Sequence, residues 1–245
     1  PTHQCRDRMM NSVAPFWDGN ETWLVLGGGA LMAAFPLAFA TIIPAFYFPI
    51  IAMLLGLIFR GVAFEFRFKS HNEHERLIWD YSFHFGSVIA TFFQGVMLGA
   101  YIKGDVFGVG IFSWLSDFSI FCGIALLFGY ALLGSTWLIL KTSDQTKIWA
   151  RKCASYVLIL VGFFTALVSF WTPFLNERIS DFWFSKPNVF YLAAIPLATL
   201  IAFIFLIRAL AKHHEKFASF RCSISEKRLK NTKKHQKTAK NSKKP

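Results

Sequence analysis

The chain has 245 residues, of which 54% are hydrophobic and only 16% are charged. This composition excludes an ordinary soluble domain, which needs more charged side chains to cover its surface. The net charge of +12 does not indicate a nucleic-acid-binding protein, because ten of the Lys and Arg residues lie in the segment 221–245, where Glu226 is the one acidic residue.

Apolar runs of about 20 residues, long enough to cross a bilayer, follow a polar lead segment at 1–15 that lacks the apolar stretch of a signal peptide. The predicted fold is an all-α polytopic transmembrane helix bundle, whose domain covers residues 16–212. The basic tail at 213–245 offers little apolar surface to bury, so we predict that it is disordered. The six predicted spans are residues 22–41, 44–66, 77–102, 118–140, 152–174 and 189–210.

The loops between the predicted spans indicate the orientation, because cytoplasmic loops of membrane proteins are rich in Lys and Arg. Loops 67–76 and 141–152 carry three and four of these residues, whereas 103–117 carries one and 175–188 carries two. We therefore predict that the lead segment and the two basic loops lie on the cytoplasmic side.

Small residues indicate where predicted helices approach one another. Gly95 and Gly99 form a GxxxG pattern in the third predicted span, which permits close backbone contact in a membrane. We expect the same of the glycine run at 27–29. The four cysteines lie far apart and form no CxxC, so neither a disulfide framework nor a zinc site is predicted.

Two carboxylates, Asp18 and Glu21, stand at the start of the first predicted span, next to Trp17. Residues three apart share one face of a helix. One interpretation is a helix cap, with Asp18 as the N-cap and Glu21 as the third helical residue. The other is a proton entry point at the cytoplasmic end of the span. The two interpretations are compatible, because a capping carboxylate can also titrate.

A second charged cluster ends the second predicted span, in LIFRGVAFEFRFK at residues 57–69. Arg60 lies about one helical turn inside the predicted boundary, where a guanidinium needs a partner and indicates a functional site. The alternative is that Arg60 extends toward the interface. Glu65 follows it, and we predict that Arg67 is an interfacial anchor.

A third cluster opens the third predicted span, in WDYSFHFGS at residues 79–87. Asp80 and His84 are four residues apart and share a helix face. His84 is compatible with a haem ligand, a proton relay or a hydrogen-bonded structural residue, and a lone His is weak support for haem. The orientation puts all three clusters in one cytoplasmic-side layer, which predicts a polar entrance.

Three segments, MNSVAPFWDGNETWLVLGGGALMAAFP, FRGVAFEFR and WDYSFHFGS, occur in this order and closely resemble subunit II of cytochrome bd-type quinol oxidase, especially its cyanide-insensitive branch. The resemblance runs from about Arg8 to about Phe220. It implies a heterodimeric core in the bacterial inner membrane that oxidises quinol and reduces O2 to water. Asp18 then matches the family aspartate on a proton path from the cytoplasm.

The resemblance also implies the cofactors and partners. Subunit I carries haems b558, b595 and d, and this chain alone is expected to bind no haem or metal, with a structural quinone as a possible addition. Quinol, membrane lipid and a small accessory subunit are the other implied partners, and nucleic acid is not among them.

The same resemblance assigns further residues. Glu21 stands where family members carry Glu or Gln, which makes it only a possible member of the proton path. Trp17 and Arg60 match positions tied to the integrity of the haem environment in the partner subunit. Glu65 and Asp80 are predicted to have a structural role in that environment.

The family subunit has eight spans and six are predicted here, so we expect a chain shortened at both ends. The absent first span would precede Arg8 and would bring an acidic partner for Arg60. Two other classes stay open. One is a secondary transporter or ion channel, in which the carboxylates are coupling sites. The other is a non-catalytic membrane scaffold subunit.

Overall fold

The computed structural model describes residues 3–104, 112–186 and 188–210, and the predicted tail at 213–245 lies outside them. Within the described residues the fold is all-helical, as predicted. The helices are α1 (His3–Val13), α2 (Trp17–Ala34), α3 (Pro36–Ala45), α4 (Tyr47–Lys69), α5 (Glu73–Lys103), α6 (Asp117–Lys141), α7 (Asp144–Trp171), the 3-10 helix η2 (Thr172–Phe174) and α8 (Glu177–Phe184). A last helix covers Asn188–Leu210.

Among the described residues, five helices are long and apolar enough to cross a membrane. They correspond to the second to sixth predicted spans, with ends that differ by a few residues. The five are α4, α5, α6, the segment Gln145–Phe174 and the helix Asn188–Leu210.

The first predicted span, 22–41, is not one helix. α2 ends at Ala34 and α3 begins at Pro36, and Phe35 between them has φ −134° and ψ 62°. Proline lacks the N–H that continues a helix, and its ring disfavours helical backbone in the residue before it. The apolar run predicted as the first span is therefore divided at Phe35 into two helices.

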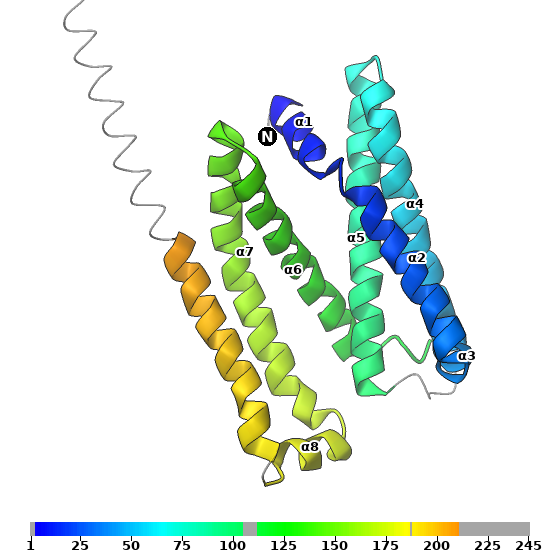
Figure 1. Ribbon diagram of the computed structural model, residues 1–245, viewed down its shortest axis with the longest axis vertical. Coiled ribbons are helices and arrows are strands. Elements are labelled where there is room, and N and C mark those ends of the chain that lie inside the picture. Colours follow the sequence, from blue (N-terminus) through cyan, green and yellow to red (C-terminus); the bar gives the residue numbers. More distant parts are fainter. Residues whose placement is uncertain (1–2, 105–111, 187, 211–245) are drawn as a thin grey trace, which may run out of the picture. The chain divides into compact units, whose positions relative to one another are not determined.

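The helices α4, α5, α6 and α7 pack in chain order, each against the next (Figure 1). Glycines allow the backbones to approach closely between α4 and α5 and between α5 and α6. A Cβ atom placed on Gly56 of α4 would lie 2.7 Å from the carbonyl oxygen of Gly86 on α5. One placed on Gly95 would lie 2.6 Å from the Cα of Gly123 on α6. Only glycine fits at such distances, so these residues set the separation of the helices.

The glycine predictions have different outcomes. The close approach predicted at Gly95 and Gly99 is confirmed, since a Cβ on Gly99 would lie 2.8 Å from the Cα of Ser119. The glycine run at 27–29 has open space instead, because no heavy atom of another described segment lies within 4 Å of a Cβ placed there. Its predicted close approach is not found within the described part of this chain.

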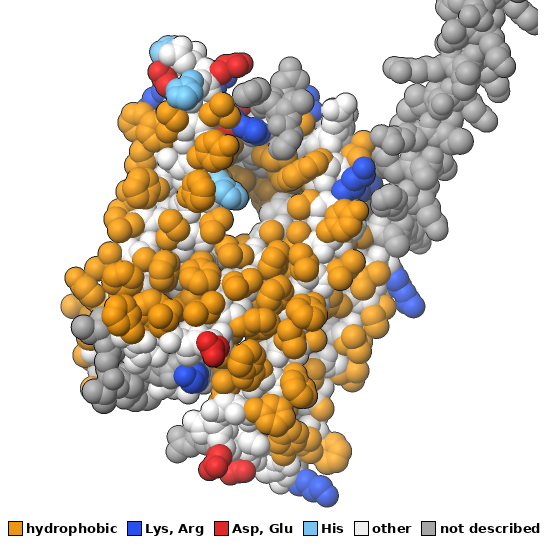
Figure 2. All heavy atoms as spheres, turned by 180° about the vertical axis from the view of Figure 1, so that it is seen from behind, with side chains coloured by type: hydrophobic (Ala, Val, Ile, Leu, Met, Phe, Trp, Pro, Cys, Tyr) orange, Lys and Arg blue, Asp and Glu red, His pale blue; other side chains and the backbone are white. Residues whose placement is uncertain are grey.

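The surface of the helices is apolar. Contacts divide the chain into two units, residues 1–192 and 193–245, and the first contains α1 to α8. On the face shown in Figure 2, hydrophobic side chains cover most of the helix surface and charged side chains gather mainly near helix ends. Trp23 is 72% exposed and Leu37 is 82% exposed. Such a surface suits hydrocarbon better than water.

Candidate functional site

The start of α2 does not form the predicted cap. The N-cap position is Phe16, and no side chain caps the helix. Asp18 lies inside the first turn, so its backbone is already helical and its side chain cannot cap. The capping interpretation is therefore wrong. The Asp18 side chain is exposed.

Trp17 and Glu21 are four residues apart and both face α4. The ring of Trp17 packs against Phe64, with 5.3 Å between ring centroids. A Cβ placed on Gly61 would lie 3.5 Å from the Trp17 ring, so the glycine leaves room for the indole. This packing turns the same face of α2, and with it Glu21, toward Arg60.

Arg60 and Glu21 form an ion pair. The distance from Arg60 Nη2 to Glu21 Oε1 is 3.2 Å, and the two side chains are 29% and 28% exposed. In this structure Arg60 is paired with Glu21, and the acidic residue expected from a span before Arg8 would lie outside the described residues. Arg60 is half-buried. Both residues also line a cavity of about 370 Å³.

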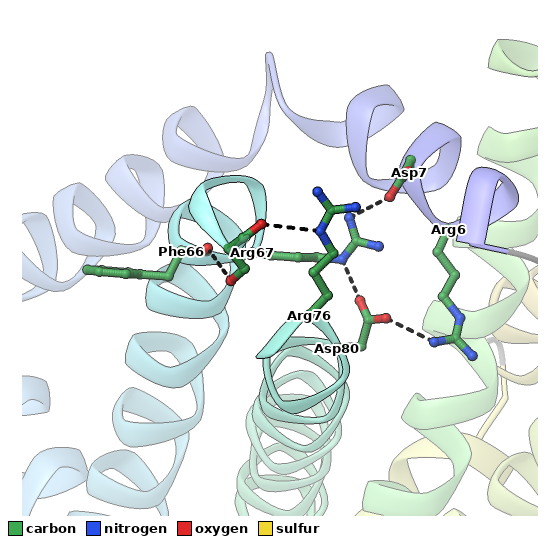
Figure 3. Close-up of polar contacts among 7 residues, drawn as sticks. Arg6, Asp7, Phe66, Arg67, Arg76 and Asp80 are labelled. Atoms are coloured by element: carbon green, nitrogen blue, oxygen red, sulfur yellow. Dashed lines mark hydrogen bonds and ion pairs between the residues drawn. The ribbon is translucent and has the colours of Figure 1, made fainter. Parts of the chain in front are cut away.

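Among the described residues, Arg67 is the charged residue that is classed as buried, with a side chain that is only 2% exposed. Its Nε donates to Asp80 Oδ1, and its Nη1 donates to Asp7 Oδ1 at 2.8 Å. The remaining oxygen of Asp80, Oδ2, accepts from Arg6 Nη1 at 2.9 Å. Figure 3 shows how these four side chains converge from α1, α4 and α5. We call them the four-charge network.

The predicted role of Arg67 as an interfacial anchor is wrong. The helix α5 returns along α4 and places Asp80 beside Arg67, while α1 brings Asp7 from another side. A guanidinium has five N–H donors in a fixed fork and can bond two carboxylates at once. The sequence analysis assigned no role to Asp7 or Arg6, because both lie in the polar lead segment outside the predicted spans.

The turn between α4 and α5 adds two further bonds to this end of the helices. Ser70 Oγ donates to the carbonyl oxygen of Phe66 at 3.0 Å, and Arg76 Nε donates to that of Ser70 at 3.4 Å (Figure 3). Glu65 lies outside the network. It is 55% exposed and approaches Lys69 at 4.0 Å, a surface pair that contributes little stability.

His84 lies beside Phe85 and lines a second cavity, of about 450 Å³, together with Arg6 and Asp80. The predicted sharing of one face by Asp80 and His84 is confirmed by this lining. In the described ranges no group of three His, Cys, Asp or Glu residues is placed to hold a metal ion. His84 is the one histidine among the residues that line this cavity.

The helix α1 connects the charged end of α4 and α5 to α6. Trp137 Nε1 donates to the carbonyl oxygen of Ser12 at 3.3 Å. The ring of Phe16 packs edge-on against Trp137, with 5.4 Å between centroids, and Lys141 Nζ lies 5.2 Å from the Trp137 ring. The three clusters predicted from sequence thus meet at one end of the helices, with α1 as an additional member.

The fold and the site together define a class: a multi-pass helical membrane protein whose charged side chains are paired at one end of its helices. The chain matches the family model for cytochrome bd terminal oxidase subunit II over residues 1–225, and it belongs to this family. With five apolar helices and bacterial relatives, it is a multi-pass protein of the bacterial inner membrane.

Three relatives illustrate the similarity. The chain is 33% identical to cytochrome bd ubiquinol oxidase subunit 2 of Bacillus subtilis, over 82% of this chain and 59% of that protein. It is 31% identical to cytochrome bd-I ubiquinol oxidase subunit 2 of Escherichia coli K12, over 68% of this chain and 46% of that protein. It is 30% identical to a probable cytochrome oxidase subunit 2 of Haemophilus influenzae, over 66% of this chain and 44% of that protein. The chain therefore spans about half the length of these relatives.

Proposed function

We propose that the chain acts as subunit II of a membrane-bound respiratory quinol:oxygen oxidoreductase. It supports a haem-bearing subunit I and contributes to proton uptake from the cytoplasm during reduction of O2 to water. The observation that carries this proposal is the family match over residues 1–225. The curated relatives from Bacillus subtilis and Escherichia coli are named as subunits of ubiquinol oxidases.

The haem chemistry belongs to the partner subunit in this proposal. His84 lines a cavity whose other walls include Arg6, Asp80, Met9 and Met10, with no second histidine among the lining residues. We assign the haems to subunit I because of the family match, and not because of the lining of this cavity. The chain instead supports the haem environment through the packing of Trp17, Arg60 and Asp80 at one end of its helices, while the exposed Glu65 contributes at most from the surface.

Asp18 is the proposed proton acceptor at the cytoplasmic mouth. Its carboxylate is exposed in the first turn of α2, where water can protonate it. Glu21 follows one turn further along the same helix and reaches a cavity inside the helices. A carboxylate that exchanges protons with water and stands next to a polar cavity is suited to proton transfer.

A secondary transporter or channel is the second candidate function, and the break between α2 and α3 is the observation that favours it. A transporter would place its charged residues at the break. Here Glu21 lies fourteen residues before Phe35, which is about 21 Å of helix. The charges and the break are thus far apart, so the oxidase subunit is the better-supported function. A scaffold subunit without a proton path would leave Asp18 without a role.

Haem spectra test whether the chain is an oxidase subunit. We expect membranes that contain this chain together with subunit I to show the haem bands of the oxidase in reduced-minus-oxidised difference spectra. The chain purified without subunit I should show no Soret band, because the proposal places all the haems in subunit I. A stoichiometric haem signal from the chain alone that disappears in His84→Ala would contradict the assignment of haem to the partner.

Asp18→Asn tests the proton path. The amide keeps the shape of the side chain but cannot titrate, so haem content should stay near normal while quinol-driven O2 consumption falls on the order of 10²-fold. Asp18→Glu should retain more activity, because a glutamate still ionises. Glu21→Gln should be milder, because the family resemblance implies Gln as an alternative there. Oxygen-electrode rates normalised to haem content give the comparison. An Asp18→Asn complex that respires at the unmodified rate would reduce Asp18 to a surface residue.

A further inference from the structure

A cavity beside the Arg60–Glu21 pair is lined by residues of α2, α4, α5 and α6. Most of the residues that line it have polar side chains. Besides the ion pair, its walls include Thr91 and Gln94 of α5 and Tyr130 of α6. Both α5 and α6 are apolar enough to span a membrane, so these polar groups lie where hydrocarbon would otherwise surround them. Polar side chains at membrane depth face the protein interior or water rather than lipid.

The cavity reaches well beyond the level of the ion pair. Gly86 of α5 is at the level of Arg60, since a Cβ placed on Gly86 would lie 3.0 Å from the Arg60 backbone nitrogen. Gln94 is eight residues further along α5, which corresponds to about 12 Å of helix. The polar lining therefore extends about 12 Å from Arg60 along the membrane-spanning helices.

The polar groups of this cavity have more hydrogen-bonding capacity than the protein contacts use. Tyr130 Oη donates to Gln94 Oε1 at 3.1 Å, which leaves the two amide hydrogens of Gln94 directed elsewhere. Arg60 has five N–H donors, and its bond to Glu21 uses one of them. A ligand that both donates and accepts hydrogen bonds satisfies such a mixture, and an apolar ligand does not.

We propose that this cavity binds a cluster of water molecules inside the membrane and extends a hydrated route from Glu21 toward Tyr130. A volume of about 370 Å³ accommodates about a dozen waters at ~30 Å³ each. Glu21 is the acidic wall of the cavity, one turn further along α2 than Asp18, which does not line it. The role of this water in proton uptake rests on the proposed function, whereas the hydration itself does not.

Cysteine labelling in membranes that contain the chain and subunit I tests the hydration. The reagent is a small water-soluble methanethiosulfonate, and mass spectrometry reads each labelled peptide, so the native cysteines can stay. The matched control is Leu55→Cys. Leu55 on α4 lies near the level of Thr91, because its neighbour Gly56 meets Ala90 of α5, but Leu55 is 50% exposed and does not line the cavity. Only the thiolate reacts, and a thiol in hydrocarbon does not ionise.

We expect Gln94→Cys to be labelled at least about tenfold faster than Leu55→Cys, because only the former contacts water. Thr91→Cys, a change of nearly equal volume, should behave like Gln94→Cys and replaces it if that variant does not accumulate. Labelling of the cavity variant as slow as that of Leu55→Cys would overturn the proposal, since an apolar helix or lipid chain would then occupy the cavity. Labelling does not depend on turnover of the oxidase. Fast labelling would therefore support the water site even if Asp18→Asn were fully active, and that activity would contradict only the role of the water in proton uptake.

Discussion

Arg67→Ala should lower the free energy of unfolding by about 3 kcal/mol, at the lower end of the range for breaking a buried ion pair. Arg67 is 2% exposed and bonds both Asp80 and Asp7. Removal of the Arg67 side chain leaves a cavity, and Asp80 and Asp7 each lose a hydrogen-bonding cation. The loss stays at the lower end because Asp80 keeps Arg6 and because Asp7, which is 42% exposed, can turn to water. Unfolding of the detergent-solubilised chain by increasing SDS measures the change.

Two further variants make this result specific. Lys69→Ala, two residues along α4, removes a cation that is 71% exposed and should change stability by less than about 1 kcal/mol. Arg67→Lys should recover only part of the loss, because an ammonium group lacks the planar fork that reaches both carboxylates. Equal unfolding midpoints for Arg67→Ala and Lys69→Ala would mean that the four-charge network does not hold α1, α4 and α5 together.

Gly95→Ala should destabilise the chain by about 1–3 kcal/mol, the usual range for overpacking. The added methyl group would lie 2.6 Å from the Cα of Gly123 and 2.7 Å from the carbonyl oxygen of Cys122. Backbone atoms cannot move aside as a flexible side chain can, so α5 and α6 must separate. The same SDS unfolding assay measures the loss, and Gly95→Val should lose more than Gly95→Ala.

Gly129→Ala is the matched control on α6. A Cβ placed there has no heavy atom of another described segment within 4 Å, so no clash is expected. Alanine has a higher helix propensity than glycine, and the variant should be unchanged or more stable by up to about 1 kcal/mol. The same chemical change is thus expected to have opposite signs at the two positions. A loss of equal size at Gly129 would show that close helix contact is not the cause at Gly95.

Much of the fold followed from the order of residues alone. Apolar runs longer than a bilayer requires predict helices, because a chain in hydrocarbon must satisfy its own backbone hydrogen bonds. Five of the six predicted spans correspond to helices for that reason. The close helix contact at Gly95 and Gly99 was also predictable from their spacing, because residues four apart share one face of a helix. The break at Phe35 was visible in principle, because Pro36 follows it.

The partners of the charged side chains were decided only by the tertiary structure. Asp18 and Glu21 look alike in the sequence, but the packing of Trp17 against Phe64 directs Glu21 to Arg60 and leaves Asp18 exposed. The bonded pairs are separated by 39 residues for Glu21 and Arg60 and by 60 residues for Asp7 and Arg67.

Hydropathy places a residue along a span, but it does not say which face of a helix meets a neighbour. Arg67 shows the consequence. At a predicted membrane boundary, a cation that reaches water and a cation that is buried between carboxylates have the same local sequence. The contacts of α1 and α5 with α4 determine that Arg67 is the buried one, because they bring Asp7 and Asp80 to it and exclude water.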